Sequence, residues 1–236
     1  MIENLQFIGT SHIAKQSIDE IKKAIATFKP NIIAVELDAQ RAQALFEKEP
    51  TKISFLQITN IGIKGYLFMK LGQIIQQRLG RMVGIAPGSE MKTAIEGARR
   101  EKLSIAFIDQ PIQITLKKLS QRITWKERCR FSIDIIKSLF FPQQQLQKIG
   151  LKKFDLKTVP GKETIKQLMK IFSTRYPSIY NVLVEERNRY MIKKLIKLLR
   201  ENPDQKILVI VGAGHEEGMK ELLLKVDVVR LSCKFH

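Results

Sequence analysis

Cysteine, histidine and long hydrophobic runs are all scarce in this sequence. Only two of its 236 residues are cysteines, Cys129 and Cys233. They have neither the spacing of metal ligands nor the number of a disulfide framework, so a reducing compartment is expected. No apolar run approaches the ~20 residues that span a bilayer, and the N-terminus lacks the basic start and apolar core of a signal peptide. The sequence therefore predicts a cytoplasmic protein.

Several motifs of known chemistry are missing as well. The sequence contains no GxSxG, no P-loop, no HExxH and no GxGxxG. Serine-hydrolase, NTPase and dinucleotide-binding functions therefore have no local support. Zinc-finger, RNP and helix-turn-helix signatures are also absent, which speaks against nucleic acid as a partner.

Basic residues, in contrast, are abundant and unevenly placed. The chain carries a formal net charge of +18, and residues 51–200 hold 30 Lys/Arg against 10 Asp/Glu. Residues 1–50 and 201–236 are nearly neutral. A solvated surface on long helices explains this charge, and an anionic membrane surface or an acidic partner is the alternative.

Short apolar runs and amphipathic segments alternate along the chain. Strands are predicted at 5–8, 32–35, 104–108, 206–211 and 226–231. Helices are predicted at 17–28 with Ser17 as N-cap, and at 40–46, 65–79, 90–101, 112–123, 126–141, 161–172, 179–201 and 216–224. Strands that alternate with helices favour an α/β fold, with a mostly parallel central sheet, helices on its faces and a basic, all-helical middle insertion.

The predicted strands lie toward the two ends of the sequence. We therefore expect a single domain over 1–236, in which 1–111 and 203–236 form the α/β core and 112–202 is a helical elaboration. The amphipathic helices also favour a homodimer.

The sequence has only three histidines, and the two internal ones end similar tetrapeptides. Gly-Thr-Ser-His ends at His12 and Gly-Ala-Gly-His at His215, and each follows a predicted strand. In open α/β sheets the carboxyl edge of the strands is where ligands bind. A histidine there is a metal ligand or general base, or a loop histidine bonded to backbone. Their shared context predicts one site assembled from both ends of the chain.

Glu36 directly follows the apolar run 32–35. A carboxylate there is poorly solvated unless it faces a cleft or a partner, and such a glutamate can bind a metal or act as a general base. A salt bridge to a neighbour such as Arg41 is the structural alternative. Asp38 is expected to cap the next helix. Asp109 also ends a strand, where a turn-capping role is the alternative.

Further acidic side chains fall within predicted helices. Glu185 is placed to pair with Arg189 four residues on, while Glu186 either projects inward or belongs to a solvated helix face. Glu90 lies in a first helical turn, where a carboxylate suits the helix dipole.

Six segments together resemble the TraB/PrgY family, most of all its archaeal branch. They occur in the family order and span nearly the whole chain: GTSH (9–12), VELD (35–38), PGSEMKTAIEGAR (87–99), DQPIQITLKKL (109–119), VEERNRYM (184–191) and GAGH (212–215). This family is related to the Tiki proteins and more distantly to erythromycin esterases and ChaN-like proteins.

The resemblance implies a hydrolase, because Tiki proteins are regarded as metal-dependent proteases that use two GxxH motifs and acidic residues. Carried over by motif, it implies catalytic roles for His12, Glu36 and Glu186. The same three residues and His215 would hold a divalent metal such as Mn²⁺, Co²⁺ or Zn²⁺, whose bound water attacks a carbonyl group.

The resemblance further implies a peptide or protein substrate. Arg187 and Asn188 would orient this substrate or stabilise an oxyanion, and Glu90 would support them. PrgY-like relatives restrain peptide signals by cleavage or sequestration, so a peptide-binding regulator without turnover is the alternative function.

A membrane-peripheral adaptor is a third function, using the basic helices near 64–82 and 122–141. Alanine variants of His12 or Glu36 separate turnover from binding, because peptide capture that survives both changes excludes turnover as the function.

Overall fold

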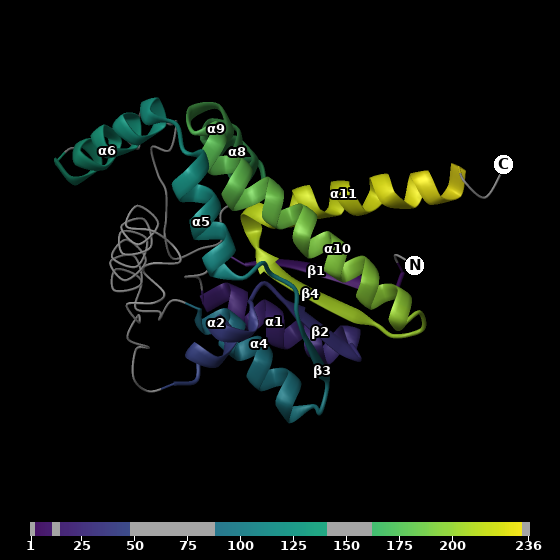
Figure 1. Ribbon diagram of the computed structural model, residues 1–236. Helices are drawn as coiled ribbons and strands as arrows, with labels where there is room; N and C mark the ends of the chain where they lie inside the picture. Colours follow the sequence, from purple (N-terminus) through teal and green to yellow (C-terminus); the bar gives the residue numbers. More distant parts are fainter. Residues whose placement is uncertain (1–2, 11–14, 48–87, 141–161, 233–236) are drawn as a thin grey trace.

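Four parallel strands form the centre of the computed structural model, which describes residues 3–10, 15–47, 88–140 and 162–232 (Figure 1). The order across the sheet is β1-β4-β2-β3, and every neighbouring pair is parallel. The strands are β1 (Leu5–Thr10), β2 (Ile32–Val35), β3 (Ser104–Phe107) and β4 (Ile207–Gly212). The predicted α/β class with a parallel sheet is confirmed.

The two inner strands, β2 and β4, are buried along their whole length. Successive side chains of a strand point to opposite faces of the sheet. Ile33 and Val35 accordingly join one hydrophobic core, and Ile32 and Ala34 join another. A parallel sheet with apolar side chains on both faces requires helices on both sides.

The first face is covered by α1 (Lys15–Phe28) and α4 (Ser89–Arg100), with the short α2 (Ala39–Ala44) at the edge. Ile21 of α1 and Met91 and Ile95 of α4 lie in this core. The second face is covered by α10 (Glu186–Glu201) and α11 (Ala213–Ser232). Apolar side chains of both helices are fully buried against the sheet, among them Met191, Leu195 and Met219.

The remaining helices form a group of their own beyond the carboxyl ends of the strands (Figure 1). They are α5 (Ile112–Arg122), α6 (Trp125–Phe140), α8 (Lys162–Arg175), α9 (Pro177–Tyr180) and the π-helical turn η1 (Asn181–Glu185). A third core joins them, in which the ring of Tyr176 makes edge contacts with Phe131 and Phe172. From α9 through η1 into α10 the chain is helical without a break, so the segment 184–191, which resembles the family, lies within one continuous helix.

Two local predictions are wrong. The strand predicted at 226–231 is part of α11, because no glycine or proline follows Met219 to end the helix and helix continuation overrides the β-propensity of the valines. Ser17 does not cap α1, since the helix already includes Lys15. The predicted helix at 65–79 and the irregular segments around it lie outside the described residues.

No helix in the described part of the chain has the length and apolar character needed to cross a membrane.

Candidate active site

The strand register brings three polar strand ends to one edge of the sheet. Val35 of β2 is level with Ile210 of β4 and with Phe107 of β3. Glu36 directly follows β2, and Asp109 follows β3 by two residues. Strand β4 ends at Gly212 and leads into α11, whose third residue is His215. The predicted meeting of Glu36 and His215 at the carboxyl edge is therefore present in the structure.

Glu36 is buried, with 5% of its surface exposed, and its carboxylate is held from two sides. Oε2 accepts a hydrogen bond from the backbone N–H of Gly212 at 2.6 Å. Oε1 accepts from Nη2 of Arg187 and lies 3.4 Å from Nε2 of His215. Arg41, the neighbour considered from the sequence, instead pairs with Asp38 and Asp109.

Arg187 is the central cation of this cluster. Its Nε and Nη2 donate to the two carboxylate oxygens of Asp109 at 3.0 and 2.6 Å, and Nη1 donates to the carbonyl of Leu183 at 3.2 Å. Burial disfavours the charged guanidinium, but the negative charges of Glu36 and Asp109 outweigh burial and raise the pKa of Arg187. The guanidinium is therefore a permanent, fixed positive charge.

His215 is buried and held through both ring nitrogens. Nδ1 lies 2.7 Å from Oδ1 of Asn188, and Nε2 lies 3.1 Å from Nη1 of Arg187. A guanidinium only donates hydrogen bonds, so Nε2 accepts and Nδ1 carries the proton that it donates to Asn188. This tautomer directs a basic lone pair at the guanidinium and at Glu36.

Close packing of two helices sets the position of Asn188. A Cβ atom built on Gly218 of α11 would lie 2.6 Å from Nδ2 of Asn188 on α10. Glycine thus lets the amide reach His215, which is one turn before Gly218 on the same helix. Sequence reasoning did not single out Gly218, although its spacing from Gly214 along the helix was a usable signal.

Asp38 and Asp109 form a second layer around the cluster. Asp38 caps α2 as predicted, with Oδ1 accepting from the backbone N–H groups of Gln40 and Arg41 at 3.0 Å. Asp109 accepts from the backbone N–H of Gln110 at 2.7 Å and also binds both arginines. Asp109 therefore stabilises a turn, as expected, and in addition orients Arg187.

Glu186 lies next to this cluster but faces α5. Its carboxylate pairs with Nζ of Lys118 at 2.6 Å and with the guanidinium of Arg122. Lys118 also donates to Oε1 of Gln110 at 3.3 Å. Glu185 pairs with Arg189 at 3.1 Å, as its spacing predicts.

Two further predicted site residues are Glu90 and His12. Glu90 is buried in the first turn of α4, a helix that covers the face of the sheet opposite α10. His12 follows β1 by two residues and lies outside the described ranges.

The described residues by themselves do not fit a divalent metal. They contain no group of three or more His, Cys, Asp or Glu side chains placed to hold one. Of the four predicted ligands, Glu36 and His215 meet, but the guanidinium of Arg187 contacts both of them, and a fixed cation repels a second one. The predicted metal remains a prediction that depends on His12.

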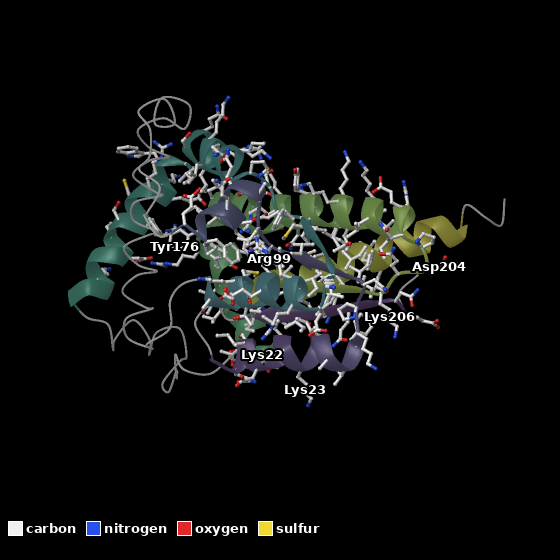
Figure 2. The ribbon with its side chains drawn as sticks, turned by 90° about the horizontal axis from the view of Figure 1, so that it is seen from below. Lys22, Lys23, Arg99, Tyr176, Asp204 and Lys206 are labelled. Atoms are coloured by element: carbon white, nitrogen blue, oxygen red, sulfur yellow. The ribbon has the colours of Figure 1, made fainter. Side chains whose placement is uncertain are left out.

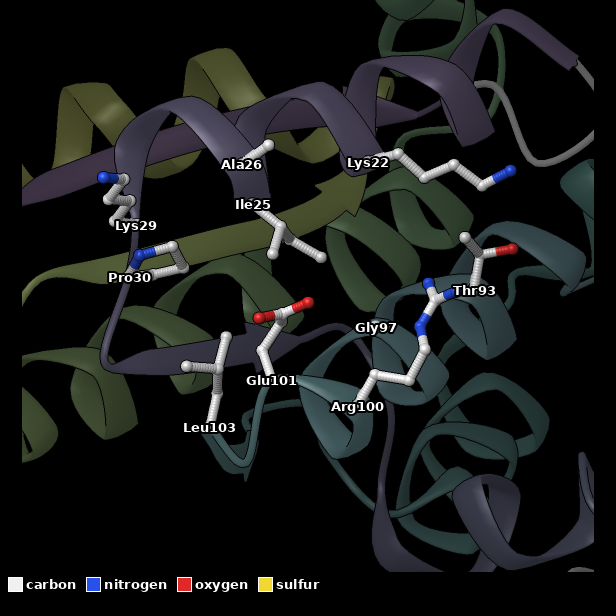
Figure 3. Close-up of a pocket in the computed structure, with 10 residues that line it drawn as sticks. All are labelled: Lys22, Ile25, Ala26, Lys29, Pro30, Thr93, Gly97, Arg100, Glu101 and Leu103. Carbon is white, nitrogen blue, oxygen red and sulfur yellow. The ribbon is translucent and has the colours of Figure 1, made fainter.

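Two recesses in the described surface lie away from this cluster. One, of about 400 Å³ between α1 and α4, is lined by Pro30 and Leu103, which precede β2 and β3, so it lies at the opposite end of the strands (Figure 3). The other, of about 820 Å³, lies between α10 and α11.

Comparison with known proteins places residues 3–226 in the TraB/PrgY/gumN family. The uncharacterized protein MJ1365 of Methanocaldococcus jannaschii is 35% identical over 95% of this chain and 54% of its own length. A human TraB domain-containing protein is 21% identical over 91% of this chain and 61% of its own length. The chain thus spans between about half and three fifths of the length of these relatives.

Among solved structures, an erythromycin esterase mutant in its open conformation is similar to this chain, with 13% sequence identity and a TM-score of 0.33. The match covers 89% of this chain and 61% of the esterase. The family match over residues 3–226 and the identity to the archaeal relative lead to the same conclusion: the chain belongs to the TraB/PrgY/gumN family.

Proposed function

We propose that this chain is a hydrolase whose reacting centre is formed by Glu36, Arg187 and His215. One observation carries the proposal: Nε2 of His215 lies 3.4 Å from Glu36 and 3.1 Å from a fixed guanidinium, inside the protein. Buried, paired charges add little to stability, and such clusters at sheet edges are typical of functional sites.

His215 is suited to act as general base. Its Nδ1–H is held by Asn188, so Nε2 can take a proton from water as the water oxygen attacks a substrate carbonyl. The imidazolium that forms would lie 3.1 Å from the guanidinium of Arg187 and 3.4 Å from Glu36, so the negative charge of Glu36 offsets the repulsion between the two cations. The same proton can then pass from Nε2 to the leaving amine or alcohol as the bond between that group and the carbonyl carbon breaks.

Arg187 is suited to stabilise the developing oxyanion. Nη1 of Arg187 has to leave Nε2 of His215 before Nε2 can take a proton from water, and Nη1 then becomes available to the substrate oxygen. Asp109 keeps the guanidinium in place during this exchange, because it binds Nε and Nη2. No step requires a metal.

We propose a peptide as substrate, since hydrolysis of an amide carbonyl uses these groups and the family resemblance implies peptides. The test is a mass-spectrometric screen of a peptide library with the purified chain. His215→Gln, which keeps a polar side chain of similar reach, is expected to lower turnover about 10²- to 10⁴-fold, the usual contribution of a general base. Glu185→Gln is the matched control, because the side chain of Glu185 is exposed and pairs with Arg189 on the surface of the helix.

Two further measurements complete the test. His12→Ala reports whether the predicted second histidine takes part in turnover. Metal analysis of the wild-type chain tests whether His12 joins Glu36 and His215 in holding Mn, Co or Zn. Stoichiometric metal that is lost in the His12→Ala/His215→Ala protein would restore the metal-dependent mechanism, and unchanged turnover in folded His215→Gln protein would refute the role of His215.

A peptide-binding regulator without turnover is the second candidate. The observation in its favour is that Glu36 and His215 are only 5% and 7% exposed and are held by hydrogen bonds. This function would be favoured if the wild-type protein captures a peptide without cleaving it and the His215→Gln and Glu36→Gln variants do the same.

A further inference from the structure

The groove between α10 and α11 has an apolar floor. Ile192 and Ile196 of α10 line it, as do Leu222 and Val226 of α11. Each pair is four residues apart and therefore shares one face of its helix. The two helices diverge toward their C-terminal ends (Figure 1), and the groove of about 820 Å³ lies between them.

One wall of this groove is strongly cationic. Five exposed basic side chains of α10 line it, and none of the lining residues in the described part of the chain is acidic. Lys194 is engaged with the carbonyl of Phe107 at 3.1 Å. The other four are spaced by four, four and three residues and so form a row along one flank of α10: Arg189, Lys193, Lys197 and Arg200. Arg189 pairs with Glu185 at 3.1 Å and Lys197 with Glu201 at 3.7 Å, and both pairs are exposed, so a partner's carboxylates can replace them.

We propose that this groove binds an acidic amphipathic helix of a partner protein. An apolar stripe of that helix would lie on the floor, and carboxylates flanking the stripe would meet the cationic row. The row runs from Arg189 to Arg200 of α10, which is roughly 16 Å along the helix axis at 1.5 Å per residue. A partner segment of about three helical turns therefore matches its length.

Charge and shape favour this occupant over others. A second copy of the chain carries the same net charge of +18 and would bring a like-charged surface to the row. A bilayer is flat on this scale and leaves a recessed floor uncovered. A nucleic acid backbone would pair with the cations but has no apolar stripe to cover the floor.

The proposal is tested with fluorescein-labelled synthetic peptides of about 14 residues, long enough for three turns. The peptides have leucines at helical spacing and glutamates on either side of the leucine stripe. The protein is titrated into each labelled peptide, and the fluorescence anisotropy of the peptide is recorded. Two control peptides carry lysine in place of each glutamate, or the same residues in scrambled order. Binding is expected for the acidic amphipathic peptides only, and it should weaken at high salt.

Matched variants locate the binding site. Lys193→Ala/Lys197→Ala is expected to weaken binding about five- to tenfold, because each exposed charge contributes modestly. Lys22→Ala/Lys23→Ala removes the same charge from exposed residues of α1, on the other face of the sheet (Figure 2), and should leave binding unchanged. Val226→Asp places a like charge on the floor and should abolish binding of the acidic peptides.

Other outcomes overturn the proposal. If no acidic peptide binds, or if both double variants weaken binding equally, the groove is not the site. Vesicles of phosphatidylcholine and phosphatidylglycerol are the second probe. If they bind the wild-type chain but not the Lys193→Ala/Lys197→Ala variant, and no peptide binds, the row is a membrane-binding surface. Sedimentation that shows a dimer disrupted by Val226→Asp would assign the groove to a second copy.

Discussion

Two arginine–aspartate pairs in this protein have similar geometry and opposite surroundings. Arg187 binds Asp109 through Nε and Nη2, and Arg175 binds Asp134 through the same two nitrogens at 2.6 Å each. The side chains of the first pair are 14% and 1% exposed, and those of the second are 47% and 19% exposed. Only the first pair lies at the edge of the sheet, against a histidine and a second carboxylate.

The comparison separates a structural ion pair from a candidate site. Asp134 on α6 ties that helix to the end of α8, and the hydroxyl of Tyr176 donates to the same carboxylate. Water competes for those charges, so the pair contributes a modest amount. The pair formed by Arg187 is kept from water, which makes it costly to assemble and costly to break.

The largest effect is expected from Arg187→Met, which removes the buried cation and keeps a long side chain. Glu36 and Asp109 would then remain buried without the guanidinium, at a cost of about 3–5 kcal/mol in the free energy of unfolding. Urea denaturation at constant m-value measures this loss.

Arg175→Met is the matched substitution in the exposed pair. It should lower the free energy of unfolding by about 1 kcal/mol or less. Equal losses in the two variants would mean that burial does not distinguish the pairs, and the reasoning that assigns a functional role to Arg187 would lose its basis.

The sequence was sufficient to predict one half of this site. Glu36 and His215 could be placed together because Glu36 directly follows one buried apolar run, His215 comes three residues after the end of β4, and parallel strands end at the same edge. The partner of Glu36 could not be predicted. Arg187 lies on α10, 151 residues away, and its direction depends on how the helical rod packs against the sheet, which no local pattern encodes.

Helix faces explain the other differences between prediction and structure. Glu186 and Arg187 are adjacent, so their side chains leave α10 about 100° apart. Arg187 faces the sheet edge, whereas Glu186 meets Lys118 on α5. The prediction of a strand at 226–231 was wrong because these residues continue α11, which begins at Ala213 and ends at Ser232.

A smaller effect is expected in the exposed pair when pH is lowered. Burial works to raise the pKa of Asp134, but hydrogen bonds from Tyr176 and Arg175 outweigh it and lower this pKa. A carboxyl group whose pKa is lower in the folded protein stabilises the fold above its ordinary pKa. That stabilisation is lost as pH falls toward and through the lowered value.

Asp134→Asn should therefore cost about 1 kcal/mol at neutral pH and less in acid. Thermal or urea unfolding of the wild-type and Asp134→Asn proteins, from neutral pH down to acidic pH, measures the difference in their free energies of unfolding. A difference that stays constant over this range would show that the charge of Asp134 does not carry the interaction.

The smallest effect is expected from Glu186→Gln. Lys118 and Arg122 are 30% and 50% exposed, so water can solvate both cations once the carboxylate is gone. The free energy of unfolding should fall by about 0.5 kcal/mol, and cleavage of a peptide substrate should change less than about threefold, because Glu186 faces α5 and not His215. The contrary result would be a loss of turnover as large as that of His215→Gln, in protein that unfolds at the same urea concentration as wild type. Such a loss would show that Glu186 takes part in the reaction. The site would then extend from the sheet edge across to α5, and the buried cluster would be only its inner part.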